Sequence, residues 1–288
     1  MPDWHAFAKF MRKVEEARRN LAFSRKDQIC FFRGHSNSQY RLLPSLFRVR
    51  LPNLRQGEKR EDAYWKLERR LFFEFRGGAR ELYTTDSTDW DVLFHMQHHG
   101  VPTRLLDWTS VFGVALYFAL LNYRPKQGLS PCVWLLNPYA LNNATWPPKP
   151  GRPARYRLYH PKYIALSRFT NQPYDFGDLL LGMHPKRWGK QRLSWKTPLA
   201  IYPYQRSERM YAQEGWFTIH GTNIAPLEDM FMQRPRAMQS ILQRVDIPKD
   251  AIPALQRFLA DAGIGPRQLF PDLSGLADSI KERFEIPR

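Results

Sequence analysis

The sequence predicts an α+β protein that folds as one domain over residues 1–288. Short β-prone runs are scattered among segments with helical spacing of apolar residues. They lack the regular alternation with helices that a doubly wound parallel sheet requires. Hydrophobic residues make up 43% of the 288 residues and aromatic residues 14%, so the chain can bury a sizeable core. No internal repeat and no long linker divides the chain into separate domains.

Six segments have the spacing of apolar residues that predicts a helix. Thr88 or Asp89 can cap the third of them and Gly100 can stop it, while Thr109 or Ser110 can cap the fourth. The predicted helices cover residues 3–22, 58–82, 89–99, 111–121, 250–262 and 273–284.

Five short runs, most of them rich in aliphatic and aromatic residues, predict strands. These runs cover residues 28–32, 103–108, 132–136, 216–219 and 242–247. Residues 138–200 are rich in Pro, Arg, Tyr and Trp and show weak periodicity, so we expect them to be mostly loop.

The net charge of +17 is concentrated in the middle of the chain. Residues 120–209 carry 15 basic and 3 acidic side chains, with tyrosine and tryptophan among them. Cations follow a phosphate backbone and aromatic rings stack on unpaired bases, so the segment predicts contact with RNA or DNA. The alternative is a solvated face whose aromatic rings pack inward. The expected nucleic-acid contacts are Arg152, Arg155, Arg157, Lys186, Arg187 and Lys190.

The two cysteines, Cys30 and Cys132, are expected to be buried thiols, because such sparse use suits a reducing cytoplasm. No apolar run reaches the ~18 residues that span a bilayer, and the first residues have no signal-peptide core. We therefore expect a cytoplasmic protein with no membrane partner. His95 and His99 are four apart on a predicted helix, but no third ligand is evident, so no metal is expected.

The stretch CFFRGHSNSQY, which begins at Cys30, carries the first candidate site. A strand that delivers Arg33 and Gly34 to a loop places a fixed cation where backbone can approach a ligand closely. Ser36 adds a hydroxyl suited to phosphate or ribose. The alternative is a structural arginine that pairs with a buried carboxylate.

Two further stretches carry polar residues at the edge of apolar runs. In PTRLLDWT, Arg104 and Asp107 are three apart, and Asp107 lies between two large apolar residues, so it is expected to be partly buried with a partner. The alternative is an ion pair that caps the following helix. In RMYAQEGWF, Gln213 and Glu214 open a predicted strand on opposite faces, so that one of them can face a cleft. The alternative is a polar pair at the edge of a strand.

The stretches FFRGHSNSQYRLLPSLFR, MQHHGVPTRLLDWTSVFGVALYFA and RMYAQEGWF resemble the three motifs of the FRG domain family, which is named for the tripeptide Phe32-Arg33-Gly34. The C-terminal stretch from Val245 resembles the end of that family, so the resemblance extends over about residues 1–285.

A more distant resemblance connects the same motifs with ADP-ribosyltransferases. It implies a small, split sheet, mixed or antiparallel, flanked by helices, with NAD as a substrate. Arg33 would hold the phosphates or the nicotinamide ribose, Trp108 or Tyr40 would stack on nicotinamide, and an acid of the third motif would stabilise the oxocarbenium-like ribose. The implied cofactor-binding residues are Gly34, Ser36, Tyr40, His98, Arg104, Trp108 and Thr109, and the implied catalytic residues are Arg33, Asp107, Gln213 and Glu214.

The third motif departs from the transferase pattern, because Gly215 stands where the acid is expected if Gln213 takes the first position. Two functions therefore remain open. One is an NAD-consuming enzyme that hydrolyses NAD or transfers ADP-ribose to a nucleic acid or protein, with a toxin or phage-defence role. The other is a non-catalytic nucleic-acid-binding module. We expect Arg33, Asp107 and Gln213 to line one cleft, and an Arg33 guanidinium more than about 15 Å from both Asp107 and Gln213 would exclude a shared site.

Overall fold

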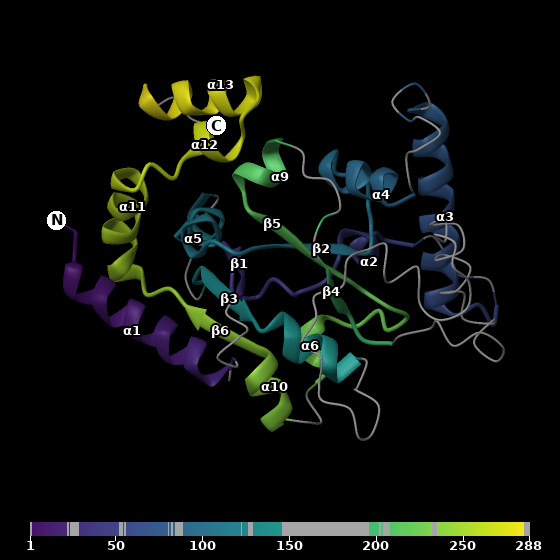
Figure 1. Ribbon diagram of the computed structural model, residues 1–288, viewed down its shortest axis with the longest axis horizontal. Helices are drawn as coiled ribbons and strands as arrows, with labels where there is room; N and C mark the ends of the chain where they lie inside the picture. The colour runs from purple at the N-terminus through teal and green to yellow at the C-terminus, as the bar shows by residue number, and fades with distance from the viewer. Residues whose placement is uncertain are drawn as a thin grey trace.

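The computed structural model gives the protein a helix-rich α+β fold (Figure 1). It describes residues 2–21, 23, 29–51, 54, 56–79, 81, 83, 89–121, 123–125, 129–145, 196–201, 203, 208–231 and 235–284.

Six strands form one sheet in the order β4-β5-β2-β1-β3-β6, and every pairing between them is antiparallel. This confirms the α+β class and the shared sheet expected for the three motif strands. The strands are β1 Phe31–His35, β2 Leu105–Thr109, β3 Cys132–Leu136, β4 Leu199–Ile201, β5 Gly215–Ile219 and β6 Leu242–Asp246.

The centre of the sheet is its weakest seam. The strands β1 and β3 pair over five residues, as do β2 and β5, but β1 and β2 are joined through one residue pair, Phe32 with Thr109. The sheet is continuous across the described residues, so the expected split into two sheets is not found. Even so, the short pairing leaves the Asp107 carbonyl of β2 free to accept a hydrogen bond from the Arg33 side chain.

The helices cover both faces of the sheet and extend beyond its ends (Figure 1). They are α1 Trp4–Asn20, α2 Ser45–Arg48, α3 Arg60–Gly78, α4 Asp89–His98, α5 Phe112–Leu121, α6 Pro138–Thr145, α9 Glu208–Ala212, α10 Pro235–Ile241, α11 Ile252–Asp261, α12 Pro266–Leu269 and α13 Leu273–Arg283.

Two separate cores lie on one face of the sheet. The α5 core joins α1, α5 and α11 to β1, β3 and β6, and it includes Phe32. The α4 core joins α3 and α4 to β2, β4 and β5, and it includes Leu105. Phe32 pairs with Thr109, and Leu105 lies four residues before Thr109 on the same strand, so both cores share a face. A third core, with α6 and α10, covers the opposite face.

The predicted helices and strands are found with shifted ends, apart from two differences. The segment 138–200 was expected to be mostly loop, but it begins with the helix α6 and ends in the strand β4. Residues 146–195 of this segment lie outside the described part of the chain. The strand β1 continues through Arg33 and Gly34 to His35, because β3 pairs with it up to Cys132, so the Arg-Gly pair lies inside the strand.

Helix packing requires a glycine at position 34. A Cβ atom on Gly34 would lie 1.9 Å from the Ala115 carbonyl oxygen and 2.5 Å from the Ala119 nitrogen. The backbone of α5 therefore lies directly against β1, which is a sufficient reason for glycine at this position. Gly34 also belongs to the lining of a pocket.

Cys30 and Cys132 are free, buried thiols, as expected, and burial raises the pKa of each to about 12. In the part of the chain that the structure describes, no helix is both long enough and apolar enough to cross a bilayer.

Candidate functional site

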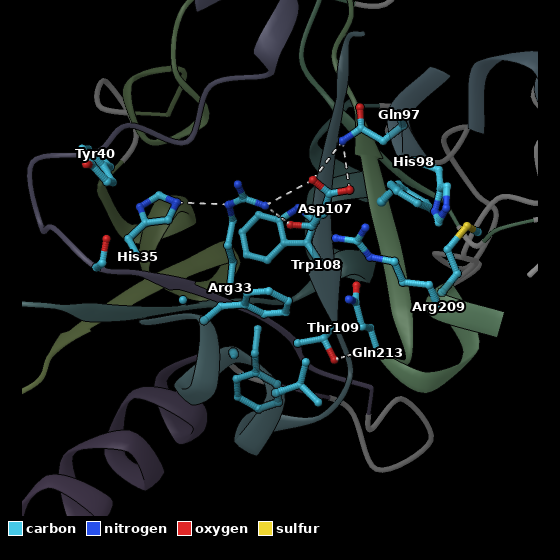
Figure 2. A pocket seen from close by; sticks show the side chains of 18 of the residues that line it. Arg33, His35, Tyr40, Gln97, His98, Asp107, Trp108, Thr109, Arg209 and Gln213 are labelled. Carbon is cyan, nitrogen blue, oxygen red and sulfur yellow. Dashed lines mark hydrogen bonds and ion pairs between the residues drawn. The ribbon is translucent and has the colours of Figure 1, made fainter. Parts of the chain in front are cut away.

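A pocket of about 410 Å³ lies where the α5 core and the α4 core meet (Figure 2). Its apolar walls come from both cores, with Phe32, Val114, Ala115 and Phe118 on one side and Phe94, Met210 and Phe217 on the other. Its polar lining comes from all three motifs: Arg33, His35, Ser36, Tyr40, Gln97, His98, Asp107, Thr109, Arg209 and Gln213. The expectation that Arg33, Asp107 and Gln213 line one cleft is confirmed.

Arg33 bridges the weak seam between β1 and β2. Its Nη1 donates to the Asp107 backbone carbonyl at 2.5 Å and lies 3.6 Å from Asp107 Oδ2, while its Nε donates to His35 Nε2 at 3.0 Å. Removal of water lowers the pKa of Arg33, and the Asp107 carboxylate opposes that shift. The guanidinium is thus held in one orientation, with its second terminal nitrogen left for a ligand.

His35 is a neutral acceptor for this arginine. Burial, reinforced by the charge of Arg33, lowers the pKa of His35 to about 3. Its Nε2 therefore carries the lone pair that accepts from Arg33, and its proton resides on Nδ1.

Asp107 is held from the side opposite Arg33 by an amide of fixed orientation. Gln97 Nε2 donates to both carboxylate oxygens of Asp107, each at 2.9 Å. The hydroxyl of Thr103 accepts from the Leu105 N–H and donates to Gln97 Oε1, which leaves the Gln97 nitrogen to face Asp107. The expectation that Asp107 is partly buried is wrong, because its side chain is 55% exposed in the pocket.

Arg104 does not belong to the pocket, which corrects its predicted cofactor-binding role. It is 4% exposed, and its Nε donates to both carboxylate oxygens of Glu68 at 2.7 and 2.9 Å. The residue spacing suggested an Arg104–Asp107 pair as one alternative, but β2 places the two on different partners.

In the third motif, Gln213 lines the pocket and Glu214 is not part of its lining. The two residues form a turn between α9 and β5 instead of opening the strand, and Glu214 has a φ of 44° in the left-handed region. The Gln213 side chain donates from Nε2 to the Leu269 carbonyl at 3.0 Å, which leaves its amide oxygen for a ligand.

The aromatic residues offered for stacking differ in access. Trp108 is 3% exposed, packs in the third core and donates from its indole N–H to Thr218 Oγ1 at 3.1 Å. Tyr40 is 55% exposed and meets the His35 ring edge to face, with centroids 6.2 Å apart. Both rings belong to the pocket lining, and Tyr40 exposes far more of its surface to a ligand than Trp108 does.

Thr109 has a structural use. Its hydroxyl donates to the Gln213 carbonyl at 2.7 Å and accepts from the Val111 N–H, two residues further on. Val111 lies directly before α5, whereas a capping side chain accepts from an N–H inside the first helical turn, so the expected capping of this helix by Thr109 is not found. Ser36 and His98 lie in the pocket lining. Removal of water, followed by the nearby charge of Arg209, lowers the pKa of His98.

Sequence reasoning missed three polar lining residues, His35, Gln97 and Arg209. Arg209 lies four residues before Gln213, and that spacing places two side chains on one face if the intervening residues are helical, as they are in α9. The six residues predicted to contact nucleic acid, Arg152 to Lys190, lie outside the described part of the chain.

Residues 28–128 match the family model of the FRG domain. The match includes β1, β2, α5 and the residues Arg33, Gln97 and Asp107, but it ends before Arg209 and Gln213. No curated protein and no solved structure matches the chain.

The pocket combines a carboxylate, two guanidinium groups and an accessible aromatic ring with apolar walls. Such a lining suits a ligand that has both a flat ring and anionic groups, and its volume lies in the usual range for small-molecule sites. In the described part of the chain, no group of three or more His, Cys, Asp and Glu side chains lies close enough together to hold a metal ion.

Proposed function

We propose that the protein binds NAD in this pocket and breaks the bond between nicotinamide and ribose. The observation that carries the proposal is the exposed Asp107 carboxylate, held between Arg33 and Gln97 in a pocket with apolar walls. Among the described residues that line the pocket, Asp107 is the only carboxylate. It supplies the negative charge that Gln213 lacks.

In the proposed reaction, the C1′–N1 bond of the nicotinamide ribose breaks and its electron pair passes to the nicotinamide nitrogen. The ribose carbon develops positive charge, which Asp107 stabilises without reorganisation because Gln97 and Arg33 already hold it in place. An acceptor oxygen then bonds to C1′ and releases its proton to solvent. Water as acceptor makes the protein an NAD glycohydrolase, and a macromolecule makes it an ADP-ribosyltransferase.

The other polar residues take supporting roles. Tyr40 stacks on the nicotinamide ring, since it is an exposed aromatic side chain of the pocket lining, next to His35. The Gln213 amide oxygen accepts from a ribose hydroxyl, because its nitrogen is already used by Leu269. The basic segment between residues 120 and 209 holds a nucleic-acid acceptor, and a toxin or phage-defence role would follow from such a modification.

The test is nicotinamide release from NAD by the purified chain, with and without RNA, DNA or cell lysate as acceptor. Asp107→Asn keeps the size of the side chain and removes its charge, so we expect turnover to fall by about 30- to 1000-fold, which corresponds to ~2–4 kcal/mol. Arg33→Ala should cause a similar loss, and Arg33→Lys should not restore turnover, because an ammonium lacks the planar fork.

Asp261→Asn serves as the matched control, because Asp261 is an exposed carboxylate paired with Arg257 outside the pocket. Full activity is expected for this variant. If the wild-type chain neither releases nicotinamide nor binds NAD by calorimetry, the proposal fails and the non-catalytic nucleic-acid-binding function is favoured.

A further inference from the structure

The pocket contains a second cation, Arg209, which reaches into it from the side opposite Arg33 (Figure 2). Two cations on opposite sides of one small pocket imply a ligand with more than one point of negative charge, or one with an anionic group away from its reacting centre.

The two arginines differ in what already occupies them. Arg33 uses its Nε and Nη1 on His35 and Asp107. Arg209 has no carboxylate partner and no side-chain hydrogen bond to the described part of the chain. Among the described residues nothing occupies its guanidinium fork, which leaves the fork for a ligand, whereas Arg33 chiefly orients Asp107.

Arg209 is nevertheless held in place. Its guanidinium carbon lies 4.7 Å from the centre of the Phe270 ring, a cation–π contact that leaves the N–H groups at the edge of the guanidinium free. Phe270 follows α12 and packs edge to face on Phe118, whose helix α5 forms the pocket wall. A stacked guanidinium loses less conformational freedom when it binds an anion.

The neighbouring histidine does not share this role. The pKa of His98 is lowered by removal of water and by the charge of Arg209, so at neutral pH His98 adds no positive charge to this side of the pocket. Arg209 is then the cation on this wall of the pocket. The neutral ring of His98 can contact either Arg209 or a ligand.

We infer that Arg209 binds a pyrophosphate group, such as that of a dinucleotide, while Arg33 and Asp107 face the ribose next to the bond that reacts. The inference deepens the proposed function, because it assigns the phosphates to Arg209 and leaves the ribose to Arg33. Phe270 acts on the ligand through Arg209, as a positioning residue.

The experiment is calorimetric titration of the full chain with ADP, inorganic pyrophosphate, AMP and adenosine. We expect Arg209→Ala to weaken ADP and pyrophosphate binding by about 10- to 100-fold, the loss typical of a hydrogen bond to a charged group. AMP should lose less, and adenosine should bind both proteins equally. Arg209→Lys should recover part of the loss, and Phe270→Leu, which keeps an apolar side chain, should weaken ADP binding to a smaller degree.

Arg267→Ala is the matched control, since Arg267 is an exposed arginine on α12 and does not line the pocket. The inference is overturned if Arg209→Ala and Arg267→Ala lose ADP affinity equally, or if Arg209→Ala binds ADP as the wild type does. It is also overturned if the wild-type chain binds neither ADP nor pyrophosphate. ADP binding that depends on Arg209 without nicotinamide release refutes the reaction alone. Nicotinamide release with an unchanged KM for NAD in Arg209→Ala refutes the inference alone.

Discussion

Arg33 contacts Asp107 twice, through the backbone carbonyl at 2.5 Å and through the carboxylate at 3.6 Å. Because β1 and β2 pair through a single residue pair, the arginine replaces ladder hydrogen bonds with side-chain contacts at the seam. The Asp107 carboxylate on β2 is thereby held at the pocket by Arg33 on β1. The same contact joins the first and second sequence motifs into one site.

The third motif provides the first prediction. Gln213→Ala should reduce nicotinamide release by about 10-fold, because its amide lines the pocket, whereas Glu214→Gln should leave the rate within about twofold. Steady-state kinetics of the two variants beside the wild type measure the difference. A severe loss in Glu214→Gln with a mild loss in Gln213→Ala would reverse the assignment of the pocket residue.

The second prediction concerns the contact between β1 and α5. Gly34→Ala should destabilise the protein by at least about 3 kcal/mol or prevent folding, since its Cβ would clash with the backbone of α5. Gly77→Ala is the control, because Gly77 is exposed in α3 with open space around it, and there alanine should stabilise by up to about 1 kcal/mol. Urea unfolding of both variants decides the matter, and a stable Gly34→Ala protein would contradict the packing described here.

The third prediction separates Arg104 from the ligand site. Glu68→Gln should cost about 3–5 kcal/mol in the free energy of unfolding, because it leaves the Arg104 charge buried without its carboxylate. Glu74→Gln, in an exposed pair with Arg70, should change stability by less than about 0.5 kcal/mol. NAD affinity of the folded Glu68→Gln protein should equal that of the wild type. A specific loss of affinity would return Arg104 to the site.

The fourth prediction is a loss of stability in acid that comes in part from His220. Burial, with a further effect of Arg104, lowers the pKa of His220 to about 3, so the folded state binds fewer protons than the unfolded state between pH 3 and pH 6.5. Stability therefore falls as the pH decreases through 6.5. From pH 7 to pH 5, this histidine should contribute a loss of up to about 2 kcal/mol.

His220→Phe should remove that part of the pH dependence, while His5→Phe, at an exposed position on α1, should retain it. Urea unfolding at pH 5 and pH 7 gives the comparison. An equal pH dependence in all three proteins would show that His220 does not stay neutral in the folded state.

The fifth prediction tests the basic segment. Binding of labelled RNA or DNA should weaken steeply with salt, and reversal of Arg152, Arg155 and Arg157 to glutamate should lower the slope of log affinity against log salt by about 3. Reversal of three exposed cations on α1, Lys9, Arg12 and Lys13, is the control with the same charge change and should have little effect. No binding at low salt, or equal effects of the two reversals, would remove the case for a nucleic-acid partner.

Much of the fold could be predicted because the spacing of apolar residues is a local property. The helices α1 and α11 and the strands β3 and β6 follow from residues that lie within a few positions of one another. The short elements α6 and β4 were missed, since each is stabilised by the other. Asn142 of α6 donates to and accepts from the backbone of Ala200 in β4, across 58 residues of sequence.

The sequence by itself determined which motifs carry polar residues next to apolar runs, and so pointed to Arg33, Asp107 and Gln213. Only the tertiary structure decided their partners. Asp107 is paired with Arg33 rather than with Arg104, and Arg104 with Glu68, because the register of the sheet and the packing of α3 bring together residues 74 and 36 positions apart. The backbone of α5 is what requires glycine at position 34. The ring of Phe270 is what holds the Arg209 guanidinium in place. Such contacts depend on which faces meet in space, and spacing along one segment carries no information about that.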